Sequence, residues 1–310
     1  MSIAYFPEIY PDELIYSWVC RYYCHNGYLN SKDALYDILR SKGRLTFEFS
    51  GNFNTEVRNL FNKLCGKGCS FLLEHTLFTY YTRFYNYQSQ QDWLKGIVSG
   101  QRASIVLKLL ELDKVHRYLQ YCPECAKDDR CRYGECYYHR EHQVPGVICC
   151  ISHNCLLKRT QVKIHHKLDI DLVPAEQIIP MEDFSVPANG ISLEYSHYLV
   201  DVLNAPLSTD SVPVGKFLRD RIDSKFILPL ERSLNLMAIA DEILTLFKPI
   251  GMTFLPYYYI GYVIKGYSHD PRVIIMLAYY LKISVAELCN PPPSGSSNEL
   301  FLETERDEYL

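Results

Sequence analysis

Two short motifs in the middle of the chain have the spacing of metal ligands. Cys122 and Cys125 form a C-P-x-C motif, and Cys150 and His153 form a C-x-x-H motif. Each motif can supply two ligands from one tight turn, and two such pairs complete the tetrahedral shell of a structural Zn²⁺ site. Three thiolates and one imidazole leave no coordination position for a catalytic water. We therefore predict a structural zinc site made of Cys122, Cys125, Cys150 and His153.

The remaining cysteines leave alternatives open. The same segment contains four more of them: Cys131, Cys136, Cys149 and Cys155. Cys155 follows His153 by two residues and could replace one of the predicted ligands. Four others are spaced in pairs at one helical turn: Cys20, Cys24, Cys65 and Cys69. Cysteines at this spacing are more often packed core residues than ligands, so a second metal site there is the less favoured alternative.

Cysteine usage and hydropathy predict a cellular compartment. Residues 1–10 contain no basic region followed by a long apolar core, as a secretory signal would. No run approaches the ~18 to 20 apolar residues that are needed to cross a bilayer. We therefore expect a cytoplasmic protein without membrane association, in which 12 cysteines stay reduced and bind metal in preference to forming disulfides.

The segment between the two motifs contains part of an enzymatic signature. His139, Arg140 and Glu141 form the H-x-E triplet that zinc deaminases combine with a later P-C-x-x-C motif. In this chain the C-P-x-C motif precedes the triplet, and Pro145 is not followed by a C-x-x-C motif. A Walker motif is also absent, so any ATPase would have to be a partner. We therefore predict that the chain is not an enzyme.

The charge distribution suggests a basic metal module. The formal net charge is −4, and residues 294–310 account for it with five acidic side chains and one arginine. Residues 116–167 carry nine Lys or Arg against five Asp or Glu. Such a module is a candidate phosphate-binding surface, although solvated charge around anionic thiolates explains it equally well. The candidate DNA contacts flank the two motifs: Arg117, Arg130, Arg132, Arg140, Lys158 and Arg159.

The elements around the metal motifs are predicted from hydrophobic periodicity. An amphipathic helix begins after Asp12 and ends at Gly27, and Ser31 is expected to cap the next one. Two short helices joined through a glycine resemble a helix-turn-helix unit. Short strands are predicted at 117–120, 144–149 and 156–162, with a turn-rich insert between the motifs. Further helices are expected at 193–203, 257–264, 271–281 and 285–289.

These elements predict a mainly α fold with a small Cys3His zinc finger or ribbon between two helical, helix-turn-helix-like domains. The expected divisions are an N-terminal helical domain, the zinc module, a connector, a C-terminal helical domain and an acidic tail that we expect to be disordered. Their predicted boundaries are 1–115, 116–168, 169–230, 231–293 and 294–310.

Three aromatic residues ahead of the first helix are candidates for binding a protein partner: Tyr5, Phe6 and Tyr10. The alternative is that they pack back onto that helix as a hydrophobic staple. The sequence favours neither of the two interpretations.

Several segments resemble one known family. The stretch RYGECYYHREHQVPGVICCISHNCLL after the C-P-x-C motif is similar to the signature of the TniQ/TnsD family of transposition target selectors. The opening FPEIYPDELIYSWVCRYYCHNGYLNSKDALYDIL and the segment EHTLFTYYTRF also resemble that family. The resemblance covers residues 5–165, and the looser match YSHDPRVIIMLAYYL at 267–281 points to the TnsD branch.

This resemblance implies a bridging role without catalysis. Family members mark an insertion site on DNA and recruit TnsC, an AAA+ ATPase that licenses the transposase. Some read a chromosomal attachment site directly, and others are carried to DNA by a CRISPR effector complex. By position, Cys122, Cys125, Cys150 and His153 correspond to the zinc ligands of the family.

Two departures from the family pattern limit what the resemblance implies. TnsD-type chains are usually much longer, so this chain is expected to be a short or truncated member, which puts autonomous reading of a DNA sequence in doubt. Tyr138 stands where relatives often carry tryptophan. The alternatives are a free-standing zinc and helix-turn-helix transcriptional regulator, and a structural adaptor without DNA contact.

Overall fold

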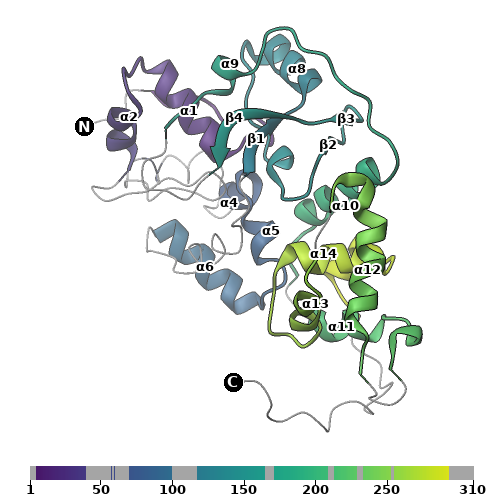
Figure 1. Ribbon diagram of the computed structural model, residues 1–310. Coiled ribbons are helices and arrows are strands. Elements are labelled where there is room, and N and C mark those ends of the chain that lie inside the picture. The colour runs from purple at the N-terminus through teal and green to yellow at the C-terminus, as the bar shows by residue number, and fades with distance from the viewer. Residues whose placement is uncertain are drawn as a thin grey trace. The chain divides into compact units, whose positions relative to one another are not determined.

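The computed structural model describes residues 5–39, 57, 59, 70–99, 117–164, 171–208, 213–228, 233–252 and 255–292. The internal contacts divide the chain into two compact units, Met1–Leu207 and Ser208–Leu310. Helices predominate within each unit, and the sheets in the described residues are two small antiparallel pairs (Figure 1). The predicted mainly α class with a small cysteine- and histidine-containing module is confirmed. None of the helices in the described ranges is long and apolar enough to cross a membrane.

The first unit opens with two helices joined by a short turn, α1 (Ile15–His25) and α2 (Ser31–Ile38). Gly27, with φ +67°, allows the chain to turn after α1. We expected Ser31 to cap α2, but the cap is Asn30, whose side chain accepts a hydrogen bond from the Asp33 amide. Asn30 has extended backbone angles whereas Ser31 is already helical, so only Asn30 can place an acceptor over the first turn.

Three more helices follow, α4 (Ser70–His75), α5 (Phe78–Thr82) and α6 (Tyr87–Ser99). All five side chains of α5 are buried, as its apolar and aromatic sequence requires. Residue Arg83, directly after α5, donates hydrogen bonds to the carbonyl oxygens of Leu203 and Ala205 at 3.3 and 2.6 Å. These bonds fix α5 to the end of α10 (Gly190–Asn204).

The N-terminal helices and the metal-motif segment share one hydrophobic core. Leu14 and Trp18 of the N-terminal segment and α1 pack in the same buried cluster as Leu119 and Tyr138 of the metal-motif segment. The Tyr138 amide donates to Ser17 Oγ at 3.0 Å, and its carbonyl accepts from the Leu14 amide at 2.9 Å. Both segments belong to the same compact unit, Met1–Leu207, within which the boundary at residue 115 stays a prediction.

Two strand pairs frame the metal-motif segment. β1 (Arg117–Tyr121) pairs antiparallel with β4 (Lys158–Ile164), and β2 (Cys149–Cys150) pairs with β3 (Cys155–Leu156). The one-turn helix α9 (Ala175–Ile178) follows β4 along the chain. The strand predicted at 144–149 is reduced to its last residue, because residues 141–143 form the 3₁₀ turn η1 (Glu141–Gln143) and Gly146 adopts φ +95°.

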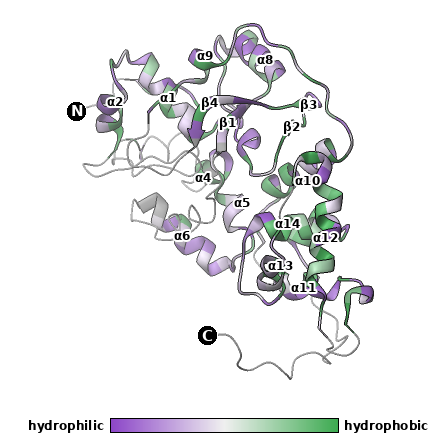
Figure 2. Ribbon diagram, in the orientation of Figure 1, coloured by the Kyte–Doolittle hydropathy of each residue, from purple (hydrophilic) through white to green (hydrophobic). Residues whose placement is uncertain are grey.

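The second unit is a helical cluster built around α14 (Pro271–Tyr280). Residues 273–278 of α14 are all buried, and α12 (Leu236–Phe247), α13 (Tyr257–Ile264) and α11 (Val214–Asp220) pack against it. Figure 2 shows that α12 and α14 carry mostly hydrophobic residues. Asp270 caps α14, and Ser284 with Glu287 forms a capping box for α15 (Val285–Cys289).

The predicted C-terminal helices are reproduced, with additions. The short 3₁₀ turns η2 (Ser224–Phe226) and η3 (Lys248–Ile250) connect the helices, and α11 lies in the segment 169–230, which was predicted to be an irregular or helical connector. Because α14 is buried along its length, the exposed face of the α13–α14 pair belongs to α13. Cys65, Cys69 and the acidic tail 294–310 lie outside the described residues.

A buried ionic network joins α1 to the loop after α8 (Pro123–Tyr133). Arg21 bonds Glu13 and Glu135, each at 2.8 Å, and the Glu13 side chain is fully buried. Burial raises the pKa of Glu13 to about 7, and the Arg21 charge only partly opposes this effect. The Arg21 guanidinium thus pairs with two carboxylates. Because its pKa is raised, Glu13 binds a proton more readily in the folded chain than in the unfolded chain.

This pKa predicts that Glu13 lowers the stability of the folded chain as the pH rises. The folded pKa lies above the ordinary value of 4.5, so the stabilising protonated form is lost between about pH 4.5 and 7. The loss corresponds to about 3 kcal/mol. Denaturant unfolding of Glu13→Gln against pH should lack this decline, whereas exposed Glu182→Gln should retain it. Parallel pH curves for wild type and Glu13→Gln would contradict the assignment.

Candidate metal centre

The first ligand pair lies at the start of α8. Cys122 is the N-cap residue with an extended backbone, Pro123 occupies the first helical position, and Gly134 ends the helix with φ +85°. The Cys125 amide donates to Cys122 Sγ at 3.4 Å. A helix N-terminus favours thiolates because its free amides carry partial positive charge. We expected a turn-rich insert here, and the structure corrects this, because the proline and glycine delimit a helix of 11 residues.

The second ligand pair lies on the β2–β3 hairpin. Cys150 pairs in register with Cys155, and His153 lies in the turn between them, where Asn154 adopts φ +49°. Ser196 Oγ on α10 accepts a hydrogen bond from the Cys149 amide at 3.2 Å. Figure 1 shows α8, the β1–β4 pair and this hairpin gathered in one part of the first unit. This hydrogen bond connects the hairpin to α10.

The four predicted ligands come together. The ligand atoms of Cys122, Cys125, Cys150 and His153 all lie within 4.8 Å of one another. His153 Nδ1 lies 3.7, 3.3 and 3.6 Å from the sulfurs of Cys122, Cys125 and Cys150, and the last two sulfurs are 3.6 Å apart. A tetrahedral ion bound at about 2.3 Å from sulfur and about 2.0 Å from nitrogen needs edges of roughly 3.5 to 3.8 Å. The four residues therefore fit a tetrahedral metal ion.

The protonation of these thiols is coupled. Cys122 Sγ accepts hydrogen bonds from Cys125 and Cys150, which lower the pKa of Cys122 well below its usual range. The same interaction raises the pKa of Cys125, and it raises the pKa of Cys150 to about 11. One thiolate thus forms easily, and a divalent cation would displace the remaining protons as it binds.

Two residues that the sequence did not single out support the ligands. Asp128 Oδ2 lies 3.2 Å from His153 Nε2, so it can orient the imidazole with Nδ1 toward the sulfurs. Buried His142 places Nε2 3.9 Å from Cys125 Sγ. Burial lowers the pKa of His142 to about 3, so the ring is neutral and can donate one N–H to the Cys125 sulfur. Asp128 lies one helical turn after Cys125, a spacing that could have identified it.

Cys155 also lies beside the centre, as the sequence alternative allowed. Its sulfur is 3.4 Å from Cys122 Sγ, and it belongs to a buried cluster with Cys122, Cys125 and Cys150. The hairpin register explains this position, since Cys150 and Cys155 are directly opposite each other. The four ligand atoms that all lie within 4.8 Å of one another include that of His153 and not that of Cys155.

Two of the predicted DNA contacts are occupied inside the protein. Arg130 Nε donates to both carboxylate oxygens of Glu176 at 3.1 and 2.9 Å, and the two terminal nitrogens donate to the carbonyl oxygens of Pro180 and Ile179. Arg140 is 7% exposed and bonds Asp12, the Leu73 carbonyl and Asn204. These guanidinium groups hold elements together, which argues against their presentation to DNA.

The other predicted DNA contacts differ in whether their side chains are paired or exposed. Lys158 pairs with Asp183 and lies 4.0 Å from the centre of the Phe184 ring. Arg132 in the last turn of α8 and Arg159 on β4 are exposed. The side chain of Arg117 lies outside the described residues. Among the side chains of this set that the structure describes, Arg132 and Arg159 are therefore the exposed cations.

The predicted partner-binding aromatics pack mostly within the chain. Phe6 packs at a tilt against Trp18 and stacks on Tyr22, with ring centres 4.3 and 4.4 Å apart. Tyr10 is enclosed between Arg21, at 3.5 Å from its ring centre, and Tyr133. Phe6 thus packs back onto α1, although it lies too far ahead of the N-cap Leu14 to form a hydrophobic staple in the strict sense. Tyr5 is 54% exposed and remains a candidate.

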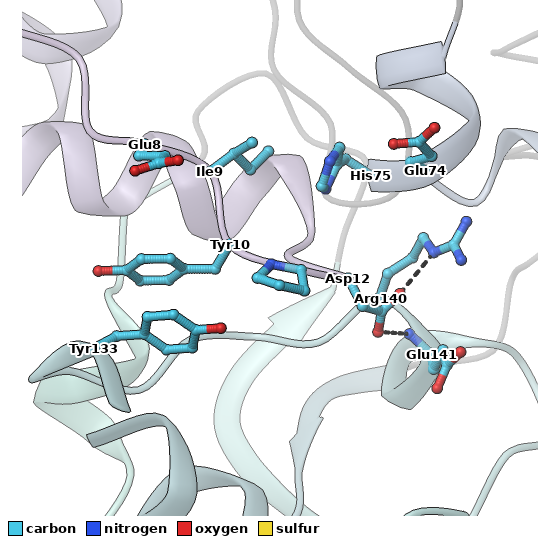
Figure 3. A pocket seen from close by; sticks show the side chains of 10 residues that line it. Glu8, Ile9, Tyr10, Asp12, Glu74, His75, Tyr133, Arg140 and Glu141 are labelled. Atoms are coloured by element: carbon cyan, nitrogen blue, oxygen red, sulfur yellow. Dashed lines mark hydrogen bonds and ion pairs between the residues drawn. The ribbon is translucent and has the colours of Figure 1, made fainter. Parts of the chain in front are cut away.

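A pocket of about 640 Å³ opens beside the N-terminal segment. Figure 3 shows Tyr10 and Tyr133 stacked at one side and Arg140 with Asp12 and Glu141 at the other. Four carboxylates line the pocket: Glu8, Asp12, Glu74 and Glu141. Because the charge of Arg140 is already paired with Asp12, this acidic pocket does not suit a phosphate group.

Comparison with known proteins agrees with the sequence signature. Residues 4–157 match the model of the TniQ family, and this range ends just beyond His153 and Cys155. The chain is also 21% identical over 212 residues to the transposon Tn7 transposition protein TnsD of Escherichia coli. That alignment covers 67% of this chain, and the chain spans only 41% of the relative. The chain therefore belongs to the TniQ family, and the matched residues contain the candidate three-cysteine, one-histidine metal centre.

Proposed function

We propose that this chain is a non-catalytic adaptor that selects the target site for DNA transposition. It would bind target DNA directly, or join it through a CRISPR effector complex, and would recruit the AAA+ ATPase TnsC. The match of residues 4–157 to the TniQ family carries this proposal, and the similarity to TnsD supports it. The metal centre would have a structural role in it.

We infer that the bound ion is Zn²⁺. Three thiolates and one imidazole at tetrahedral spacing are the donor set typical of structural zinc sites. Four protein ligands fill the shell, so the ion would have no open position for a substrate or a nucleophilic water. Its contribution is to hold α8 against the β2–β3 hairpin and so fix the surface that carries Arg132 and Arg159.

The proposed DNA surface predicts a change in salt dependence. Replacing Arg132 and Arg159 together by alanine should weaken binding to all duplex sequences alike and lower the slope of log affinity against log salt by about two. Fluorescence anisotropy across a potassium chloride series measures both quantities. Lys127→Ala is a matched control, because that exposed cation on α8 is already paired with Glu124 at 3.1 Å. An unchanged slope in the double variant would exclude these arginines from the interface.

The adaptor role is tested by reconstitution. The full chain is mixed with its cognate AAA+ ATPase, nucleotide and duplex DNA, and the products are separated by size-exclusion chromatography with light scattering. A complex containing all three components is the expected result. Salt-dependent binding to a promoter without any association with the ATPase would instead favour a transcriptional regulator.

A further inference from the structure

Helix α13 exposes an unusual density of tyrosine. Its first turn consists of Tyr257, Tyr258 and Tyr259, which are 48, 44 and 45% exposed. Tyr262 on the same helix is 48% exposed, and Tyr267 just beyond it is 77% exposed. Large aromatic side chains gathered at this exposure commonly mark a binding surface.

The opposite face of α13 is firmly held within the second unit. Ile260 and Val263 are 0 and 1% exposed. A Cβ atom at Gly215 of α11 would lie 2.2 Å from the Val263 carbonyl oxygen, so the two backbones meet where only glycine fits. A Cβ atom at Gly261 is 3.0 Å from the Leu236 side chain of α12. The tyrosines therefore extend from a helix that cannot easily shift.

The rings also support one another. Tyr258 meets Tyr259 edge to face at 4.7 Å between ring centres, and it meets Tyr257 and Tyr262 at 6.0 and 5.8 Å. Mutual contact restricts the rings before any partner arrives. A partner then loses less side-chain entropy on binding than it would with isolated tyrosines.

The charge around α13 suits an anionic partner. Residues 243–269 contain no Asp or Glu, whereas they include Lys248 and Lys265. Lys216 is exposed on α11, next to the contact of Gly215 with α13. The first turn of α13 follows Pro256 without a side-chain cap, so the partial positive charge of the helix start is not offset by a carboxylate.

We propose that α13 lies against the sugar–phosphate backbone of target DNA, with the hydroxyl groups of Tyr257, Tyr258 and Tyr259 donating to phosphate oxygens. The inference rests on the DNA binding proposed above and adds a second contact surface, in the second unit. Tyrosine hydroxyls are common donors to phosphates, and such contacts position a protein without reading sequence. A protein partner could use the same rings, but the 27-residue stretch without a carboxylate favours a polyanion.

The test separates hydroxyl donors from ring contacts. Binding of the full chain to a fluorescein-labelled duplex of random sequence is measured by anisotropy over a salt series. The variants are Y257F/Y258F/Y259F, its alanine counterpart, and the control Tyr36→Phe, whose side chain is 76% exposed on α2. Thermal unfolding confirms that the phenylalanine changes leave the fold intact.

The phenylalanine triple variant should bind at least about tenfold more weakly, since each neutral hydrogen bond contributes about twofold to tenfold. Its salt slope should equal that of the wild type, because neutral hydroxyls release no counterions. Normal DNA binding by the phenylalanine triple variant would overturn the inference. This holds even if the alanine triple variant binds DNA weakly, and even if the phenylalanine variant no longer binds the ATPase. If DNA binding depends on Arg132 and Arg159 but not on the tyrosines, this inference alone fails. A wild-type chain that binds no DNA overturns this inference and the direct mode of the proposed function, and leaves delivery to DNA through a CRISPR effector complex.

Discussion

Replacing Cys150 by serine is expected to release the bound metal and unfold the segment between β1 and β4. Cys150 approaches Cys125 Sγ and His153 Nδ1 at 3.6 Å each, so its loss removes one corner of the tetrahedron. Metal-coupled folding of small zinc modules is worth on the order of 10 kcal/mol. Because Leu119 and Tyr138 share a core with α1, the unfolding should extend to the N-terminal helices. Elemental analysis and thermal unfolding with and without a chelator measure the effect.

Two matched variants define the ligand set. Cys131 is exposed on α8, so Cys131→Ser should keep both metal and stability. Cys155→Ser should also keep the metal if His153 is the fourth ligand, whereas loss of the ion in this variant would assign the position to Cys155. Wild-type protein that contains no metal and resists chelators would contradict the centre itself.

Replacing Arg140 by alanine should destabilise the first unit by about 3 kcal/mol, because the Asp12 carboxylate, which is 22% exposed, and two further acceptors lose their charged donor. Arg140 bonds Asp12 Oδ1 at 2.9 Å, the Leu73 carbonyl oxygen at 2.6 Å and Asn204 Oδ1 at 2.5 Å. One guanidinium therefore joins the N-terminal segment, α4 and α10 to the metal module. Denaturant unfolding monitored by circular dichroism gives the free-energy difference.

Lysine at this position should recover little of the lost stability, because a single ammonium group cannot reproduce three donors in a planar fork. Arg132→Ala is the matched control and should change the free energy of unfolding by less than about 0.5 kcal/mol, since that side chain is exposed. The variant Asp12→Asn combined with Arg140→Ala should be less destabilised than the sum of the single changes. A loss below about 1 kcal/mol in Arg140→Ala would contradict the structural role.

Local sequence determined the features that depend on near neighbours. The C-P-x-C and C-x-x-H spacings identified the four residues whose ligand atoms come together, because each pair is formed within one turn. The bounds of α13 and α15 agree with the sequence prediction, since proline, a capping serine and hydrophobic periodicity act within a few residues. The same local reasoning missed α8, whose hydrophilic surface gives almost no apolar period; Figure 2 shows it largely hydrophilic.

Tertiary structure decided what each charged or aromatic side chain does. Arg130, Arg132, Arg140 and Arg159 are equivalent by sequence, yet two are bonded to carboxylates and carbonyls from distant segments and two are exposed. Asp128 supports the ring of His153, which lies 25 residues further along the chain, and His142 supports the sulfur of Cys125, which lies 17 residues earlier. Only the folded chain brings these pairs into contact. The exposed tyrosine face of α13 exists because Gly215 lets α11 cover the other side. Spacing along the chain specifies ligands and helices, whereas burial and pairing depend on which distant segments the fold brings together.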